Sequence, residues 1–335
     1  MKTYLITGGS GFIGSHFIEK IIKNKNNFVL NLDIKKENIF EKNIKKNYKF
    51  IKGNILNKNL IKEIIKHNKP NYIVNFAAHT HVDKSIGNPV IFIKNNVNGT
   101  LNLLEALKEC NFKERFVHIS TDEVYGSLDF EDKPFNLESK IYPKNPYSIS
   151  KATSDFFVNY FHEAYKIDCI ITRCSNNFGE RQYPEKLIPL TIMKCLNKKK
   201  IPIYGTGKNI RDWLYVKDHC EGIFKALKKG KSGEIYLFGG SNQLTNLSIV
   251  KKITKYFNIK YNNFDYNNLI EFVKDRVNHD KRYEIDFSKS TRELNYFPSN
   301  EFDKYFNNTI KFYVDNYKHY NKIMNKAPWF RKNYE

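Results

Sequence analysis

The sequence predicts an α/β protein with a doubly wound parallel sheet and a smaller C-terminal domain. Short apolar runs alternate with amphipathic stretches through the first half of the chain. The first run is followed directly by a glycine-rich turn, Gly8-Gly9-Ser10-Gly11-Phe12-Ile13-Gly14. Parallel strands buried on both faces show such short apolar runs, and the crossovers between them need helices.

The individual elements follow from the same alternation. We expect strands at 4–7, 28–32, 49–51, 72–76, 115–119 and 169–172, each a short apolar run. We expect helices at 13–22, 56–67, 90–110 and 147–165, where apolar residues recur at helical spacing.

The pattern changes beyond residue 175. Pro184, Pro189, Pro202 and the turn Gly205-Thr206-Gly207 divide the chain into shorter elements. A strand and helix at 213–229 and a strand at 234–238 predict a return to the sheet within 212–245. We therefore predict one domain over 1–175, with that return, and a second over 176–335. The aromatic tail at 296–330 is expected to serve packing.

Composition excludes several classes of protein. The 335 residues carry a formal net charge of +21, but the excess is Lys scattered among Asn and Ile, whereas nucleic-acid readers tend to cluster Arg. Such a uniform bias is typical of an AT-rich genome. Five cysteines without Cys-x-x-Cys spacing predict neither a disulfide framework nor a metal site. No apolar run approaches the ~18 residues of a membrane span. We expect a cytoplasmic protein, with no membrane and no nucleic acid as partner.

The glycine turn predicts a dinucleotide cofactor. Gly8, Gly11 and Gly14 lie between a strand and a helix, where glycine permits the tight turn and the close approach of pyrophosphate. Asp33 ends the next strand and can accept hydrogen bonds from both ribose hydroxyls, which favours NAD over NADP. The domain over 1–175 is thus predicted to be a Rossmann-type NAD-binding domain.

A second motif predicts acid–base chemistry. Tyr147-Ser148-Ile149-Ser150-Lys151 places Tyr and Lys on one helix face at i, i+4 spacing. An ammonium beside a phenol stabilises the phenolate, so we expect a lowered Tyr147 pKa and an acid/base role.

With these motifs the chain resembles the extended short-chain dehydrogenase/reductase family, and within it the nucleoside-diphosphate-glucose 4,6-dehydratases. The resemblance extends to about residue 298. The segments that carry it are Phe76-Ala77-Ala78 with His81-Val82-Asp83, STDEVYG at 120–126, YSISKA at 147–152, RCSNNFG at 173–179, PEKLIP at 184–189, NIRDWLYV at 209–216, and Asp275-Arg276 with His279-Asp280.

The resemblance implies an NAD-dependent lyase. Tyr147, poised by Lys151, takes the proton of the sugar C4 hydroxyl while hydride leaves C4, and Thr121 hydrogen-bonds the C4 oxygen. Glu123 removes the C5 proton, Asp122 protonates the departing C6 hydroxyl, and hydride returns to C6. Two neighbouring carboxyls with opposite roles require one to stay protonated. The product is a 4-keto-6-deoxy sugar, which implies deoxysugar biosynthesis such as that of rhamnose.

The resemblance also assigns binding residues. The cofactor would be held by Gly8, Gly11, Phe12, Ile13, Gly14, Asp33, Asn54, Ile55, Ala77, Ala78, Tyr147 and Lys151. The nucleotide sugar, bound mainly by the domain over 176–335, would meet His81, Asn176, Glu185, Lys186, Leu187, Tyr204, Arg211, Asn246, Arg276 and His279. The helices near 90–110 and 147–165 resemble those of the family's homodimer interface.

Three departures from the family pattern keep alternatives open. The segment 34–43 after Asp33 is short and lysine-rich, and Asn54 stands where an Asp is usual. His79-Thr80 stands where the dTDP-glucose enzymes usually carry Glu-Ser, a variant closer to UDP-glucose 4,6-dehydratases. The expected substrate is dTDP-glucose, with UDP-glucose as the alternative. A 4-epimerase or decarboxylase is disfavoured by Asp122-Glu123, and a nucleic-acid-binding protein is the remote alternative.

Overall fold

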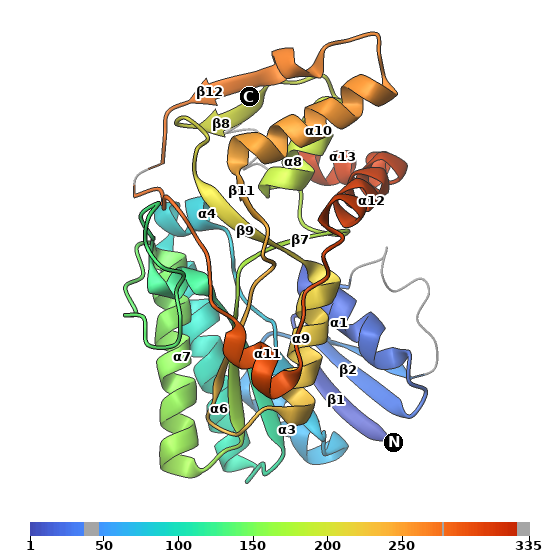
Figure 1. Ribbon diagram of the computed structural model, residues 1–335. Coiled ribbons are helices and arrows are strands. Elements are labelled where there is room, and N and C mark those ends of the chain that lie inside the picture. Colours follow the sequence, from blue (N-terminus) through green and yellow to red (C-terminus); the bar gives the residue numbers. More distant parts are fainter. Residues whose placement is uncertain (37–46, 277, 327–335) are drawn as a thin grey trace.

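The computed structural model describes residues 1–36, 47–276 and 278–326 (Figure 1). Its strands are β1 (Lys2–Thr7), β2 (Asn27–Asp33), β3 (Tyr48–Lys52), β4 (Tyr72–Asn75), β5 (Arg115–Thr121), β6 (Cys169–Cys174), β7 (Asn176–Phe178), β8 (Ile201–Tyr204), β9 (Ile210–Tyr215), β10 (Ile235–Phe238), β11 (Gln243–Thr245) and β12 (Ile270–Val273).

The helices include ones at the expected stretches 13–22, 56–67 and 147–165, whereas the expected helix at 90–110 is divided into three elements. The helices are α1 (Phe12–Ile22), α3 (Lys58–Asn68), α4 (Val82–Gly87), α5 (Pro89–Phe92), α6 (Gly99–Glu109), α7 (Pro146–Tyr165), α8 (Leu187–Leu196), α9 (Val216–Lys229), α10 (Asn246–Lys260), α11 (Ser288–Leu294), α12 (Phe302–Asp315) and α13 (Tyr317–Lys326). A π-helix, η1 (Ile93–Asn98), joins α5 to α6, and the short 3₁₀ helices are η2 (Asp122–Tyr125) and η3 (Tyr266–Leu269).

The described residues form a seven-stranded parallel sheet in the order β3-β2-β1-β4-β5-β6-β10. The direction of winding reverses between β1 and β4, and open parallel sheets bind ligands at the carboxyl ends of strands beside such a reversal. The doubly wound fold class is confirmed. The glycine turn after β1 lies at this reversal.

The sheet separates two hydrophobic cores. Along β1, Tyr4 and Ile6 pack into the core that contains Phe17 of α1, whereas Leu5 packs into the core that contains Leu103 of α6. Successive strand residues point to opposite faces, so an unbroken apolar run serves both cores. Figure 1 shows α1 and α9 on one face and α3, α6 and α7 on the other.

The smaller C-terminal part contains two further sheets, β11-β9-β7 and β12-β8, with α8, α10, α12 and α13 around them (Figure 1). The expected return to the main sheet within 212–245 is made by β10 alone. β9 pairs instead with β7. It also pairs with β11, because the chain turns back after β10. The Asp212 carboxylate anchors that turn by accepting hydrogen bonds from the backbone N–H groups of Gly240 and Asn242, both at 2.8 Å.

The aromatic tail packs, as expected, where the structure describes it. Tyr296, Phe306, Tyr313 and Tyr320 are all buried. Residues 327–330 of that tail, and 37–43 of the lysine-rich segment, lie outside the described ranges. Within those ranges no helix is both long and apolar enough to cross a membrane.

Candidate active site

Two adjoining cavities lie at the carboxyl ends of the strands. The larger, of about 1280 Å³, is the glycine-turn cleft, which runs from Gly8 past Asp33 and Ala77. The smaller, of about 380 Å³, is the Glu123 cavity. His81 and Glu185 line both. A long ligand in the cleft would therefore end beside a second ligand in the cavity.

The glycine turn keeps the backbone close to its neighbours. Gly8 has a φ of +67°, a left-handed conformation, and a Cβ there would lie 2.6 Å from the Ala77 backbone nitrogen. A Cβ on Gly14 would lie 2.5 Å from the Gly8 carbonyl oxygen. Only glycine fits both places, so the strand, the turn and the start of α1 stay in contact beneath the cleft.

Asp33 ends β2 at the rim of the cleft. One carboxylate oxygen accepts the backbone N–H of Ser10 at 3.0 Å, and the other accepts that of Lys35 at 3.3 Å. Burial raises the pKa of Asp33, and these backbone donors oppose the rise. A carboxylate oxygen has further lone pairs, so Asp33 can still accept hydrogen bonds from a diol.

Eight of the residues expected at the cofactor line the glycine-turn cleft: Gly8, Gly11, Phe12, Asp33, Asn54, Ile55, Ala77 and Ala78. Ile13, Gly14, Tyr147 and Lys151 are not among its lining residues. Asn54 is exposed, and its side-chain oxygen accepts the Leu56 backbone N–H at 2.9 Å.

The acidic pair begins η2, directly after β5. Asp122 is 1% exposed, and burial, followed by the charges of Glu123 and Asp212, raises its pKa well above the usual value. Its Oδ1 accepts from the Thr121 hydroxyl at 3.3 Å, while Oδ2 has no hydrogen-bond partner among the described residues. This environment favours the protonated form of the carboxyl.

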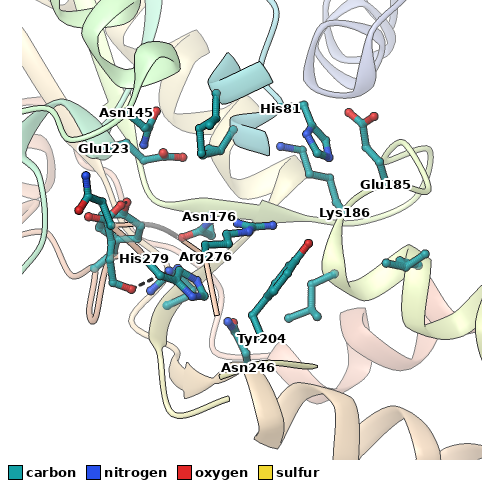
Figure 2. A pocket seen from close by; sticks show the side chains of 18 of the residues that line it. His81, Glu123, Asn145, Asn176, Glu185, Lys186, Tyr204, Asn246, Arg276 and His279 are labelled. Atoms are coloured by element: carbon teal, nitrogen blue, oxygen red, sulfur yellow. Dashed lines mark hydrogen bonds between the residues drawn. The ribbon is translucent and has the colours of Figure 1, made fainter. Parts of the chain in front are cut away.

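Glu123 faces the cavity, where Figure 2 shows it next to Asn145. Burial raises its pKa too, but the Lys186 ammonium and a hydrogen bond from Asn145 oppose the rise. The pKa of both carboxyls is raised, and the shift is larger for Asp122. This order suits Asp122 as the acid and Glu123 as the base.

We expected a lowered pKa for Tyr147, and this expectation is wrong when only the groups of the protein itself act on the phenol. Burial, followed by the Glu123 carboxyl, raises the pKa of Tyr147 well above its usual value, and a hydrogen bond with Thr121 only partly opposes this. The Lys151 ammonium is not among the groups that offset it. Burial lowers the pKa of Lys151 itself to about 8. Spacing on a helix face does not reveal the acidic residues of η2 that face the phenol.

All ten residues expected at the sugar nucleotide line the Glu123 cavity: His81, Asn176, Glu185, Lys186, Leu187, Tyr204, Arg211, Asn246, Arg276 and His279. They come from seven separate segments of the chain. Figure 2 shows Arg276 beside Tyr204, and the guanidinium carbon lies 4.5 Å from the ring centroid.

The cations of this cavity are held by neighbours. Arg211 donates from Nη2 to the Asp280 carbonyl oxygen at 3.0 Å, and its guanidinium lies 4.5 Å from the centre of the Tyr283 ring. Lys186 donates to the Thr80 carbonyl oxygen at 2.8 Å, and burial lowers its pKa. Preoriented cations of this kind suit a diphosphate.

The two histidines remain neutral. Burial and the surrounding cations lower the pKa of His81 to about 2. His81 caps α4, its Nδ1 accepting from the Lys84 backbone N–H at 3.3 Å. Burial also lowers the pKa of His279, whose Nδ1 lies 2.6 Å from an Asp275 carboxylate oxygen.

Several lining residues escaped the sequence analysis. Asn145 caps α7 in a reciprocal capping box with Ser148. The sequence Asn-Pro-Tyr-Ser is typical of a helix start and could have indicated this cap. Tyr183 reaches the glycine-turn cleft with the Lys35 ammonium 5.8 Å from its ring centroid. Tyr320 and Ile323 bring α13 to the same cleft, and nothing in their spacing indicates a distant partner.

The comparisons with known proteins agree with this geometry. The family model described as GDP-mannose 4,6 dehydratase matches residues 5–309. The chain belongs to this GDP-mannose 4,6-dehydratase family. A dTDP-glucose 4,6-dehydratase of Haemophilus influenzae is 40% identical over 338 residues, which cover 94% of this chain and 99% of that protein. The resemblance inferred from the motifs is thereby confirmed.

Solved structures place the chain in the same part of the GDP-mannose 4,6-dehydratase family. The dTDP-glucose 4,6-dehydratase DesIV of Streptomyces venezuelae, solved with NAD bound, has a TM-score of 0.88 and 36% identity, covering 94% of this chain and 97% of its own. That of Bacillus anthracis, in complex with NAD, has a TM-score of 0.85 and 38% identity, with coverages of 95% and 98%.

Proposed function

We propose that this protein is an NAD-dependent dTDP-glucose 4,6-dehydratase. The observation that carries the proposal is the acidic pair: a buried Asp122 with a raised pKa stands next to Glu123, which opens on a cavity lined by cations. A lyase that removes water needs both an acid and a base, whereas a 4-epimerase or decarboxylase on this fold does not need this pair. The dTDP-glucose 4,6-dehydratases named above support the choice.

The glycine-turn cleft fits NAD. The left-handed Gly8 and the close contact of Gly14 leave backbone rather than side chains facing the space where a pyrophosphate approaches. Asp33 can accept both hydroxyls of a ribose, and Asn54, Ile55, Ala77 and Ala78 would line the adenosine and nicotinamide sides. When bound, NAD supplies a hydride acceptor at the sugar C4 and returns the hydride at C6.

Tyr147 removes the proton of the C4 hydroxyl, assisted by Thr121. The protein groups raise the pKa of Tyr147, and Lys151 is not among those that oppose the rise. We assign Lys151, on the same helix face, to stabilise the phenolate once cofactor and sugar are bound. Thr121 lies at the end of β5, and its hydroxyl, which donates to Asp122 at 3.3 Å in the structure, would donate to the C4 oxygen once substrate is bound. The resulting ketone makes the C5 proton acidic.

Elimination follows at the acidic pair. Glu123 takes the C5 proton, while the protonated Asp122 gives its proton to the departing C6 hydroxyl, which leaves as water. The proton and the hydride then return to C5 and C6. Lys186, Arg211 and Arg276 bind the diphosphate, and His81, Asn176, Glu185, Leu187, Tyr204, Asn246 and His279 complete the site for sugar and nucleoside. We divide these tasks between a cofactor domain at 1–175 and a domain at 176–335.

UDP-glucose is the second candidate substrate, and His79 is the feature that favours it. The side chain of His79 lines the glycine-turn cleft, however, and is not among the residues lining the Glu123 cavity. It therefore lies on the cofactor side and has no direct route to a nucleobase near Asn246. This placement supports dTDP-glucose as the first choice.

The experiment is incubation of the protein with NAD and either dTDP-glucose or UDP-glucose, followed by mass spectrometry. Loss of one water without net reduction of NAD is expected, faster with dTDP-glucose. Folded, NAD-loaded protein that dehydrates neither sugar nucleotide would refute the function. Faster turnover of UDP-glucose would overturn the choice of base alone.

We further propose a homodimer through the helices at 90–110 and 147–165. Val90, Ile93, Phe156 and Tyr160 expose 49–69% of their surface on α5, η1 and α7. A second copy would cover these apolar side chains. Sedimentation should show a dimer that Phe156→Glu dissociates, whereas Ile259→Glu, at a position 75% exposed on α10, should not. A monomeric wild type would refute this interface.

A reducing, cytoplasmic location is proposed on the cysteines, because all five are free thiols and four of them are buried. The product class would place the enzyme in deoxysugar biosynthesis, with rhamnose as one end product. Detection of the protein in a fractionated cell, and of a 4-keto-6-deoxy product in its extract, tests both statements.

A further inference from the structure

His118 is a fully buried histidine that the proposed reaction does not use. It lies on β5 with 0% of its surface exposed, and its Nε2 is 3.0 Å from the Lys151 Nζ. The same Nζ donates to the Ile119 carbonyl oxygen at 2.7 Å. An ammonium has three N–H donors. These two contacts fix its position and leave one donor for the reaction.

The far side of the imidazole is also held. The side-chain nitrogen of Asn75 on β4 lies 3.2 Å from the His118 Nδ1, and its side-chain oxygen accepts from the Thr7 hydroxyl on β1 at 2.6 Å. The Lys151 ammonium needs an acceptor at Nε2, which requires this amide to be turned over. Amide oxygen and nitrogen can exchange places. With the oxygen towards His118, Asn75 accepts the Nδ1 proton, so Nε2 is left as an acceptor for the ammonium.

The charges around the pair favour this neutral form. Burial, followed by the charges on Lys151 and Arg173, lowers the pKa of His118 well below its usual value. Asp155 of α7 is the nearest carboxylate: its Oδ1 is 3.7 Å from Nε2, while its Oδ2 accepts from Ser120 and from Arg173, both at 3.0 Å. Imidazole rather than imidazolium therefore faces Lys151.

A buried ammonium such as that of Lys151 is stabilised by hydrogen-bond acceptors. Burial lowers its pKa to about 8, and Asp155 and the Cys174 sulfur of β6 oppose the fall. Removing a hydrogen-bond acceptor from a buried ammonium disfavours the charged form further. Less charge at Lys151 would in turn leave the Tyr147 phenolate without its cation.

We propose that His118 is the positioning residue of Lys151, whose ammonium it holds in place and in its charged form through a hydrogen bond accepted at Nε2. His118 contacts Lys151 and has none of its surface exposed, so it acts on the reaction through Lys151. The consequence for turnover rests on the proposed function; the effect on Lys151 does not.

The first test therefore needs no turnover. His118→Gln and His118→Met have side chains of equal length, but only Gln offers an oxygen near the place of Nε2. The ¹³C resonance of the Lys151 ε-carbon, identified by its loss in Lys151→Met, reports the ammonium titration. We expect His118→Met to lower the Lys151 pKa by about one pH unit and His118→Gln to stay within about half a pH unit of wild type.

The second test uses the pH profile of dTDP-glucose dehydration. In His118→Met the acidic limb of kcat should move to higher pH, and kcat at neutral pH should fall about tenfold for every pH unit by which the limb moves. His118→Gln should recover most of the loss, and KM should stay within about twofold in both, because uniform binding is unchanged. A wild-type protein without turnover would refute the proposed function. The titration of the Lys151 ammonium would then decide the role of His118 by itself.

His219→Phe is the matched control. His219 is also fully buried, its Nδ1 lies 2.9 Å from the Asn177 side-chain oxygen, and burial lowers its pKa to about 3. This variant should lose thermal stability without moving either the Lys151 titration or the acidic limb. An unchanged Lys151 titration in folded His118→Met would overturn the proposal. If His118→Met does not fold, His118→Gln decides. A Lys151 pKa in His118→Gln that is lowered by about one pH unit, the shift expected for His118→Met, would also overturn the proposal.

Discussion

Arg276 and Asp83 form a two-point ion pair at the Glu123 cavity. The Arg276 Nη2 lies 3.0 Å from Asp83 Oδ2, and Nε lies 2.8 Å from Oδ1. Asp83 belongs to α4, whereas Arg276 follows β12, so the pair joins the two parts of the chain. It also places an anion next to a cation that the proposed substrate must reach.

The pair predicts an asymmetric mutational response. Arg276→Gln should weaken dTDP binding about 30-fold, about 2 kcal/mol, because the diphosphate loses a cation and faces an uncompensated Asp83. Adding Asp83→Asn should restore part of the affinity by removing that repulsion. Isothermal titration calorimetry checks both. A double variant that binds more weakly than Arg276→Gln alone would contradict the role assigned to Arg276.

Glu123→Gln should separate oxidation from elimination. The amide cannot take the C5 proton, so turnover should fall by at least about 100-fold, while Tyr147 and Lys151 still permit oxidation at C4. Stopped-flow absorbance should then show reduced nicotinamide accumulating, and mass spectrometry should show no loss of water. Turnover equal to that of wild type would exclude Glu123 as the base.

Asp122→Asn should change the pH dependence of stability. The unfolded chain releases this proton near pH 4, whereas the folded protein retains it, so wild-type stability falls as the pH rises from about 4 towards the higher folded pKa. Asn has no such proton. The Tm of the variant should therefore exceed that of wild type increasingly as the pH rises. Calorimetry from pH 4 to 8 measures this, with Glu131→Gln, an exposed carboxyl, as control. A difference that grows on acidification would contradict the buried, protonated Asp122.

Gly8→Ala should damage both the fold and the cofactor cleft. A left-handed φ costs an L-residue about 1–2 kcal/mol, and the added Cβ would meet the Ala77 backbone. We expect a lower Tm and an NAD affinity reduced more than tenfold. Gly87→Ala, where a Cβ meets nothing within 4 Å, should keep or raise the Tm. An Ala at position 8 that leaves both quantities unchanged would remove the conformational argument for this turn.

Local patterns predicted the fold well because each one reports a local cause. The alternation along Tyr4, Leu5 and Ile6 follows from a sheet covered on both faces, and the glycine turn follows from the conformation that Gly8 must adopt. The residues expected around the Glu123 cavity came from a resemblance carried by several motifs, and in the structure all ten line that cavity. Their individual roles stay predictions.

What the sequence could not indicate are contacts between distant segments. The raised pKa of Tyr147 depends on burial and on the carboxyls of η2, and the pairing of β9 with β11 depends on a turn anchored by Asp212. The contact of Arg276 with Asp83 spans 193 positions. No periodicity or spacing reports such a distance, because both residues would look the same on any exposed helix or loop.

His81 and Glu185 belong to the walls of both cavities, and this has a thermodynamic consequence. Both ligands would contact these same two side chains, so the binding of either one changes the surroundings of the other. Such coupling is reciprocal: the factor by which NAD tightens dTDP binding must equal the factor by which dTDP tightens NAD binding. A cofactor held more firmly while sugar occupies the neighbouring cavity stays with the protein throughout a turnover in which it is both reduced and reoxidised.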